Sequence, residues 1–260
     1  MDKPPKLHAV NLHVALGKAQ VLSGLDLELA PLTVTVIVGP NGSGKSTLLR
    51  TLGRLQKARS GQVKLEGTPL AKLKTRAIAR EIAVLPQGLT APEGISVRDL
   101  IARGRMPHQH PLQQWREEDA AVIDAVLRET GLQALADRPV AALSGGQQQR
   151  VWIAMILAQQ TDLLLLDEPT TFLDLPHQID LLGFIRRLCD EAGKTIVMVL
   201  HDINLAARFA DRIVALREGA IVADGTPGKV VTQPIMREVF GLECSVIKDP
   251  LHAKPYVIPN

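Results

Sequence analysis

The segment Gly39–Ser46 reads Gly-Pro-Asn-Gly-Ser-Gly-Lys-Ser and matches the pattern G-x-x-x-x-G-K-[S/T], which constrains the fold more than any other feature of the chain. The apolar run Val34–Val38 leads into it, and Ser46–Leu55 has the residue pattern of a helix. A strand, a glycine-rich loop and a helix in this order let backbone N–H groups approach a phosphate without an intervening side chain. The helix N-terminus also attracts the anion. The pattern predicts a nucleotide-binding α/β domain.

Two residues of this loop have predicted roles of their own. Lys45 is expected to reach the β- and γ-phosphates, and the Ser46 hydroxyl is expected to bind Mg²⁺. Average amino-acid usage produces such a pattern by chance in about 1% of chains of this length. The predicted nucleotide contacts from the loop are Gly39, Pro40, Asn41, Gly42, Ser43, Gly44, Lys45, Ser46 and Thr47. The expected ligands are therefore a nucleotide and Mg²⁺.

Composition excludes several other classes of function. The chain has 260 residues, with 30 basic against 27 acidic side chains, and only 3% of its residues are aromatic. So small a positive excess, with few rings for base stacking, gives no indication of a nucleic-acid partner. Cys189 and Cys244 cannot by themselves form a disulfide framework or a four-cysteine zinc site. We find no signal-peptide core and no run of about 18 apolar residues, so we expect an intracellular protein that does not itself span a membrane.

Further apolar runs predict strands that alternate with helices. Strands are expected at Leu7–Val14, Val21–Leu29, Gln62–Leu65, Ile82–Leu85, Leu163–Leu166 and Ile196–Leu200, and a hairpin at Arg212–Asp224 with its turn at Glu218-Gly219. Helices are expected at Ser96–Arg103, Arg116–Thr130, Gly146–Gln159 and Pro176–Ala192. This alternation favours a mostly parallel sheet covered on both faces, interrupted by a helical insert at about residues 88–160.

Polar residues follow four of the predicted strands. These clusters are Gly39–Thr47, Gln87, Asp167-Glu168 and His201-Asp202. Ligands of parallel sheets bind outside the carboxyl ends of the strands, so we expect the four clusters to form one site. Asp167 is then placed to hold Mg²⁺ together with Ser46, and Glu168 to polarise the attacking water.

The segment Leu143-Ser144-Gly145-Gly146-Gln147 points to a particular family. A serine and two glycines before a helix can form a second anion-binding N-terminus, although an ordinary helix cap has the same residues. Following the phosphate loop and preceding the acidic strand end, the segment resembles the LSGGQ signature of the ATP-binding subunits of ABC transporters. The resemblance covers nearly the whole chain. It implies that Leu143, Ser144, Gly145, Gly146 and Gln147 of one subunit close over the ATP of a second subunit in a head-to-tail homodimer.

The same resemblance assigns three further residues. Gln87 is similar to the glutamine that senses the γ-phosphate and binds Mg²⁺, and it joins the helical insert to the core. Asp174 matches the loop that contacts the opposite subunit, and His201 matches the switch histidine at the γ-phosphate. The resemblance therefore implies Glu168, His201 and Gln87 as catalytic residues, and Ser46, Gln87 and Asp167 as the magnesium ligands.

The fold implied by the resemblance is α/β: a P-loop NTPase core of the ABC type, with an N-terminal antiparallel β region and an inserted α-helical subdomain. Residues 1–260 would form one ATP-binding domain, with the core at 1–87 and 161–260 and the subdomain with the signature at 88–160. Two departures stand out. Leu16 occupies the position where the family usually has an aromatic residue against adenine, and the turn Ala30–Thr33 lacks the customary glycine.

Within the family, four segments most resemble the ATPases of iron–siderophore importers of the ferric-enterobactin type. They are Arg103–His108, Trp152–Gln159, Leu173–Leu182 and His201–Asn204. Importers of haem or vitamin B12 have similar ATPases and remain the alternative. The implied partners are two transmembrane permease subunits and, indirectly, an extracytoplasmic substrate-binding protein. The implied location is peripheral, on the cytoplasmic face of the inner membrane.

Two readings from other classes stay open. A non-transport ABC protein acting on DNA or ribosomes generally has paired ATPase domains or long coiled-coil insertions, and neither is evident in this sequence. A simple P-loop kinase or GTPase lacks the signature and the ordered Gln87, Asp174 and His201. Residues 241–260 resemble the family's C-terminal extension, and no chemistry is assigned to them.

Overall fold

The computed structural model describes residues 6–109 and 116–260, and predictions that fall on residues 1–5 and 110–115 lie outside the described residues. The strands are β1 (Leu7–Leu16), β2 (Ala19–Leu29), β3 (Val34–Val38), β4 (Ser60–Leu65), β5 (Thr68–Pro69), β6 (Ile82–Leu85), β7 (Leu163–Asp167), β8 (Thr195–Val199), β9 (Arg212–Arg217), β10 (Ala220–Gly225), β11 (Cys244–Lys248) and β12 (Pro255–Pro259). The helices are α1 (Lys45–Leu52), α2 (Thr75–Glu81), α3 (Val97–Ala102), α4 (Glu117–Glu129), α5 (Gly145–Ala158), α6 (Leu175–Asp190), α7 (Ile203–Phe209), α8 (Pro227–Val230) and α9 (Gln233–Phe240).

A six-stranded sheet forms the centre of the molecule, in the order β10-β9-β3-β8-β7-β6. The strands β9, β3, β8, β7 and β6 are parallel neighbours, and only β10 runs antiparallel, through its hairpin with β9. The predicted parallel sheet and the hairpin at Glu218-Gly219 are therefore confirmed. Because β3, β6, β7 and β8 are parallel, their carboxyl ends reach the same edge.

The apolar strand runs are explained by burial on both faces of this sheet. Alternate residues of β3 enter different cores: Val36 packs with the helical segment that follows β6, whereas Ile37 packs with α1 and the N-terminal sheet. Strand β7 divides in the same way, with Leu164 in the first core and Leu165 in the second. A strand buried on both faces reads as a continuous apolar run, as observed.

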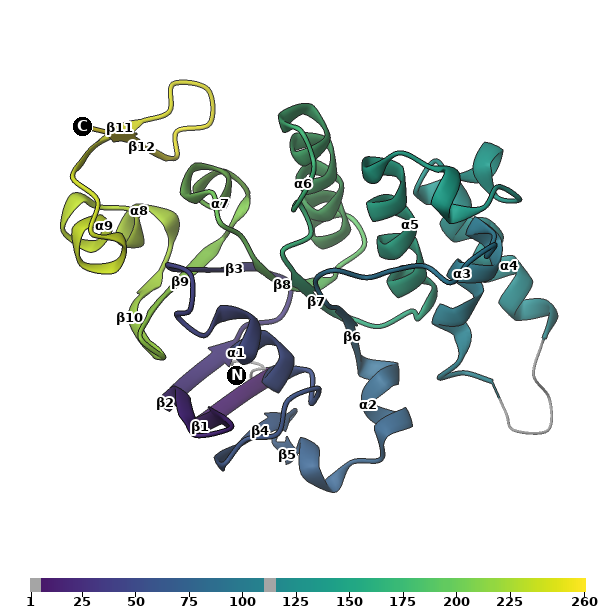
Figure 1. Cartoon of the computed structure of the whole chain (residues 1–260), viewed down its shortest axis with the longest axis horizontal. Coiled ribbons are helices and arrows are strands. Elements are labelled where there is room, and N and C mark those ends of the chain that lie inside the picture. The colour runs from purple at the N-terminus through teal and green to yellow at the C-terminus, as the bar shows by residue number, and fades with distance from the viewer. Residues whose placement is uncertain (1–5, 110–115) are drawn as a thin grey trace.

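A second sheet, in the order β2-β1-β4-β5, is wholly antiparallel and covers one side of α1 (Figure 1). Its strands alternate buried and exposed residues, as in the burial pattern of β1, because one face packs on the core and the other does not. This sheet and the segment of α3, α4 and α5 lie at opposite sides of the central sheet (Figure 1). The expected α/β fold with an antiparallel N-terminal region and an inserted helical segment is confirmed.

The helical segment has a charged pair at its centre. Arg105 donates from Nε to Asp119 Oδ1 at 2.8 Å and from Nη1 to the carbonyl of Ala158 at 2.8 Å. Both charged side chains are less than a tenth exposed. A buried pair of this kind costs about 3–5 kcal/mol to break on one side, so it holds the start of α4 and the end of α5 in one register.

Sequence patterns did not predict α2, α7, α8, α9 or the β11–β12 hairpin. The hairpin is attached to α7 by a two-way amide contact: Asn204 Nδ2 donates to the Val257 carbonyl at 3.1 Å, and the Val257 N–H donates to Asn204 Oδ1 at 2.7 Å. Within residues 6–109 and 116–260, none of the helices combines the length and apolar character needed to cross a membrane.

The packing of the helical segment can be tested at Gly104, next to the end of α3. A Cβ on Gly104 would lie 2.0 Å from the Met155 carbonyl oxygen on α5, whereas a Cβ on the exposed Gly228 would meet nothing within 4 Å. We expect Gly104→Ala to lower the free energy of unfolding by about 2 kcal/mol through overpacking. Gly228→Ala, the matched control, should leave it unchanged or slightly higher in urea denaturation. Equal midpoints for the two variants would contradict the close backbone approach.

Candidate active site

The loop between β3 and α1 has a backbone that side chains would obstruct. Gly39 has a φ of +150°, and a Cβ there would lie 2.2 Å from the Leu216 carbonyl oxygen. Gly44 precedes the first residue of α1 with a φ of +100°, in a conformation that L side chains rarely adopt. The loop therefore requires glycine at both positions, and its N–H groups are available around a concave turn.

Lys45 is the first residue of α1, and its ammonium is held inside the loop. The side chain is buried, and Nζ donates to the carbonyls of Gly39 and Pro40, at 2.9 Å each. Burial lowers the pKa of Lys45, and the nearby carboxylates of Glu168 and Asp167 act in the opposite direction. The result is a cation with little access to water, which is well suited to bind a phosphate.

Asp167, the last residue of β7, lies directly against α1. The Ser46 hydroxyl donates to Asp167 Oδ1 at 2.8 Å, and Arg50 Nε lies 3.6 Å from Oδ2. Oδ2 is buried, and within the described residues it has no hydrogen-bond partner. Burial, the largest cause, raises the pKa of Asp167. A buried carboxylate oxygen without a donor, next to a hydroxyl oxygen, is a ligand set that fits a magnesium ion.

Glu168 follows directly, and three side chains hold its carboxylate. Gln87 Nε2 donates to Oε2 at 2.6 Å, His201 Nε2 lies 2.6 Å from Oε1, and Thr171 Oγ1 donates to Oε2 at 3.0 Å. The side chain of Glu168 is only 10% exposed, and its backbone is strained, with a φ of +52°. Such strain persists only where the surroundings fix a residue, as these partners do here. The carboxylate is thereby oriented at the sheet edge.

The structure thus brings together all four clusters that were predicted to meet at this edge. Hydrogen bonds join the phosphate loop to Asp167 and Gln87 to Glu168, and His201 lies within ion-pair distance of Glu168. Thr171 and Arg50 were not recognised in the sequence. A threonine three residues after an acidic strand end is the only local signal for the first, and no pattern pointed to the second.

The segment Leu143–Gln147 caps helix α5 and faces the same region without touching the phosphate loop. Ser144 and Gln147 form a reciprocal capping box, in which Ser144 Oγ accepts from the Gln147 N–H at 3.4 Å and Gln147 Oε1 accepts from the Ser144 N–H at 3.1 Å. Gly145 and Gln148 line a cavity of about 290 Å³, whose other walls include Gln87 and Glu168. The start of α5 therefore shares a cavity with Gln87 and Glu168 at the sheet edge.

Two further predicted residues lie on the surface. Leu16, at the end of β1, is 49% exposed and pairs with Ala19 across the tip of the β1–β2 hairpin. Asp174 is the exposed residue before α6, and its carboxylate is hydrogen-bonded to His177. The structure joins neither residue to the phosphate loop by a hydrogen bond among the described residues.

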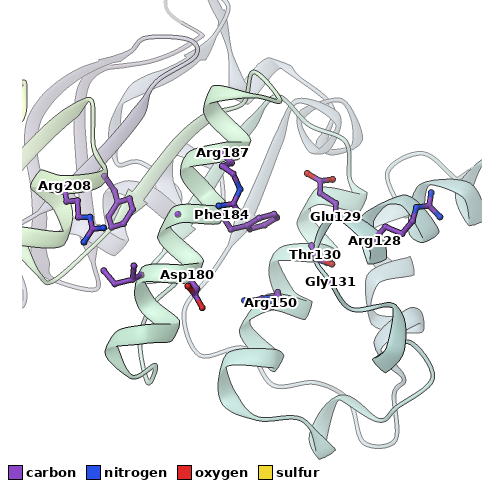
Figure 2. A pocket seen from close by; sticks show the side chains of 12 residues that line it. Arg128, Glu129, Thr130, Gly131, Arg150, Asp180, Phe184, Arg187 and Arg208 are labelled. Atoms are coloured by element: carbon purple, nitrogen blue, oxygen red, sulfur yellow. The ribbon is translucent and has the colours of Figure 1, made fainter. Parts of the chain in front are cut away.

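A second cleft, of about 510 Å³, lies away from the phosphate loop, between the helical segment and the core (Figure 2). It is lined from α4, α5, α6 and α7, whose arginines there are Arg128, Arg150, Arg187 and Arg208. Two guanidinium groups lie over aromatic rings, Arg187 at 5.9 Å from the centre of Phe184 and Arg208 at 5.2 Å from that of Phe209. No residue predicted for the nucleotide site lines this cleft.

The buried charge of Asp167 gives a testable dependence of stability on pH. Its raised pKa means that the folded chain binds this proton more tightly than the unfolded chain, so the ionised form destabilises the nucleotide-free fold. We expect Asp167→Asn to raise the melting temperature at pH 7. The gain should shrink as the pH falls towards about 4, because the wild-type carboxyl then takes up a proton.

Asp162 serves as a control, because its pKa is shifted in the opposite direction to that of Asp167. Its exposed carboxylate accepts from Lys6, a hydrogen bond that lowers the pKa of Asp162. Asp162→Asn should therefore be neutral or slightly destabilising at pH 7 in the same thermal melts. A lower melting temperature for Asp167→Asn would show that attraction by Arg50 and Lys45 outweighs the cost of burial.

Known proteins are similar in sequence to this chain over nearly its full length. A siderophore transport ATP-binding protein, YusV of Bacillus subtilis, is 49% identical and covers 96% of this chain and 90% of its own length. The achromobactin transport ATP-binding protein CbrD of Dickeya dadantii is 50% identical, over 95% of this chain and 92% of its own. The hemin import ATP-binding protein HmuV of Myxococcus xanthus is 40% identical, over 98% of this chain and 97% of its own length.

Solved structures share the fold. A metal-chelate type ABC transporter in an inward-facing conformation superposes with a TM-score of 0.85 and 26% identity, over 100% of this chain and 98% of that one. The ATP-binding cassette MJ0796, a dimer bound to ADP and phosphate, superposes with a TM-score of 0.74. The two sequences are 28% identical, over 85% of this chain and 98% of that one. The family model described as ABC transporter matches residues 22–171, which include the phosphate loop, Glu168 and the signature segment. The chain belongs to the ABC transporter family of ATP-binding proteins.

Proposed function

We propose that this ATPase powers the import of an iron chelate, and that its cargo is a ferric siderophore. The observation that carries the proposal is the identity of 49–50% to two ATP-binding proteins named for siderophore and achromobactin transport. The compared protein named for hemin import is less similar, at 40% sequence identity. Haem and vitamin B12 remain the alternative cargoes, since the chemistry of ATP hydrolysis would be the same for each.

Glu168 is proposed to polarise the water that attacks the γ-phosphate. The hydrogen bonds from Gln87 and Thr171, together with the close contact of His201, fix the direction of its carboxylate. His201 and Gln87 are proposed to sense the γ-phosphate, since both reach the same carboxylate, from the ends of β8 and β6 on either side of β7. Lys45 is proposed to bind the β- and γ-phosphates from within the loop. Leu16 is proposed as an aliphatic contact for adenine.

The proposed magnesium ligands are Ser46, Asp167 and Gln87. Asp167 Oδ2 supports this assignment, because it is a buried carboxylate oxygen that no donor of the described residues satisfies. A bound magnesium ion would neutralise phosphate charge as the terminal phosphate is transferred to water. Ser46 and Asp167 are already in hydrogen-bond contact, so the oxygen atoms they would offer are positioned before the ion binds.

The signature segment is proposed to act on the ATP of a second copy of this chain. Among the described residues, a Cβ on Gly145 would meet nothing within 4 Å, so no contact in that part of the chain requires glycine at this position. Glycine there leaves backbone N–H groups at the start of α5 open to an anion from outside. The dimeric cassette MJ0796, bound to ADP and phosphate, supports a dimer as the working unit.

The remaining partners follow from the proposed transport role. Two transmembrane permease subunits would receive motion from the helical segment, and an extracytoplasmic binding protein would deliver the cargo to them. The chain would sit peripherally on the cytoplasmic face of the inner membrane. The proposed division is a core of residues 1–87 and 161–260 and a helical subdomain of residues 88–160, which would rotate against it as ATP closes the dimer.

The cargo can be tested in cells that lack this chain, by measuring uptake of labelled ferric siderophores, haem and vitamin B12 side by side. We expect loss of ferric-siderophore uptake alone, restored by the wild type. Glu168→Gln should bind ATP and dimerise but restore no uptake, because the attacking water is no longer polarised. Lys45→Ala should fail at the earlier step of ATP binding. Loss of haem or vitamin B12 uptake instead would identify a different importer.

The role of Gly145 in the dimer can be separated from folding. We expect Gly145→Ala to keep the melting temperature and the ATP affinity of the isolated subunit, since there is room for the methyl group within the chain. Hydrolysis by the assembled transporter should fall at least about tenfold, because the added methyl group meets the phosphates of the partner's ATP. Analytical ultracentrifugation with ATP in a Glu168→Gln background measures the dimer directly. An undiminished dimer and full hydrolysis would exclude this role.

A further inference from the structure

His177 connects two segments that are far apart in the sequence. It lies in the first turn of α6, and its ring Nδ1 is hydrogen-bonded to the carboxylate of Asp174, the residue before the helix. Asp174 occupies the N-cap position, yet its side chain makes no capping hydrogen bond to the helix backbone. The hydrogen bond to His177 is the main cause that lowers the pKa of Asp174. The ring is therefore the main partner of this carboxylate.

The carbon edge of the same ring lies against the signature segment. A Cβ on Gly146 would be 3.1 Å from His177 Cδ2 and 3.4 Å from Cγ, which is tighter than ordinary van der Waals contact. The backbone of Gly146 is helical, so its φ does not require glycine. The neighbouring Gly145 has open space at the same distance. Within this chain, the His177 ring is thus what favours glycine at 146.

We infer that His177 is a positioning residue, which holds the Asp174 carboxylate in a fixed place relative to the signature helix α5. The inference rests on the proposed function, in which the signature contacts the ATP of a second subunit, and on the family resemblance, which places Asp174 against that subunit. With the ring in place, the two segments reach the dimer interface as one unit. Without the ring, the Asp174 carboxylate and the signature segment would no longer hold a fixed position relative to each other.

The chain contains a matched pair without such a connection. His252 Nδ1 lies 2.8 Å from Asp249 Oδ2, with the same spacing of three residues, in the turn between β11 and β12. That turn carries no residue of the nucleotide site. His252→Ala removes an Asp–His pair of the same kind and serves as the control for loss of a surface hydrogen bond.

The experiment compares His177→Ala, His177→Asn and His252→Ala in the assembled transporter, over a range of ATP concentrations. We expect His177→Ala to lower kcat about tenfold, a loss of roughly 1.4 kcal/mol of transition-state stabilisation. ATP binding by the isolated subunit should be unchanged, since the phosphate loop is intact. His177→Asn should restore turnover, because Cγ, Nδ2 and Oδ1 of asparagine replace the ring atoms Cγ, Nδ1 and Cδ2. His252→Ala should behave as the wild type.

A double-mutant cycle tests the contact itself. Gly146→Ala pushes the methyl group into the ring, so it should lower the melting temperature of the isolated subunit in the wild-type background and lower it little more once His177→Ala is present. Additive losses, or a kcat of His177→Ala equal to that of the wild type, would overturn the inference. The proposed function fails in a different way, through a wild-type transporter that hydrolyses no ATP.

Discussion

The parallel pairing of β3, β8, β7 and β6 is the constraint on which the site depends. Each of these strands ends in polar residues, and parallel pairing is what brings the phosphate loop, His201, Asp167 and Gln87 to a single edge. Two separate cores, one on each face, keep the strands in register. Substitutions that loosen either core would therefore displace residues of the candidate site that they do not touch.

The sequence predicts this part of the molecule well because its signals are local and strong. An apolar run buried on both faces, followed by a fixed pattern such as Gly39–Ser46, identifies a strand end and its chemistry in one short segment. The hairpin at Glu218-Gly219 is similarly local, since both turn residues have positive φ. Order along the chain then places Gln87, Glu168 and His201 at the same edge, where Gln87 is hydrogen-bonded to Glu168 and His201 Nε2 lies 2.6 Å from its carboxylate.

Elements that depend on distant contacts could not be predicted in this way. Helix α7 and the β11–β12 hairpin are short, and they are joined through the amide of Asn204 to Val257, a contact across 53 positions. Thr171 reaches Glu168 only because Glu168 adopts a left-handed backbone, which no residue pattern encodes. The same applies to His177 and Gly146: His177 is an ordinary helix residue by pattern, the sequence assigns Gly146 only to the signature segment, and their contact appears only in the fold.

The site also carries much of the unfavourable energy of the nucleotide-free fold. Lys45 and Asp167 are charges held in a buried setting, and burial shifts both pKa values towards the neutral forms. Glu168 adds backbone strain next to them. A bound nucleotide would relieve the two burial penalties together, because its phosphate would pair with Lys45 and its accompanying cation would pair with Asp167 Oδ2. Nucleotide binding should therefore stabilise the core most strongly at the carboxyl ends of β3 and β7, where Ser46 already ties α1 to the acidic strand.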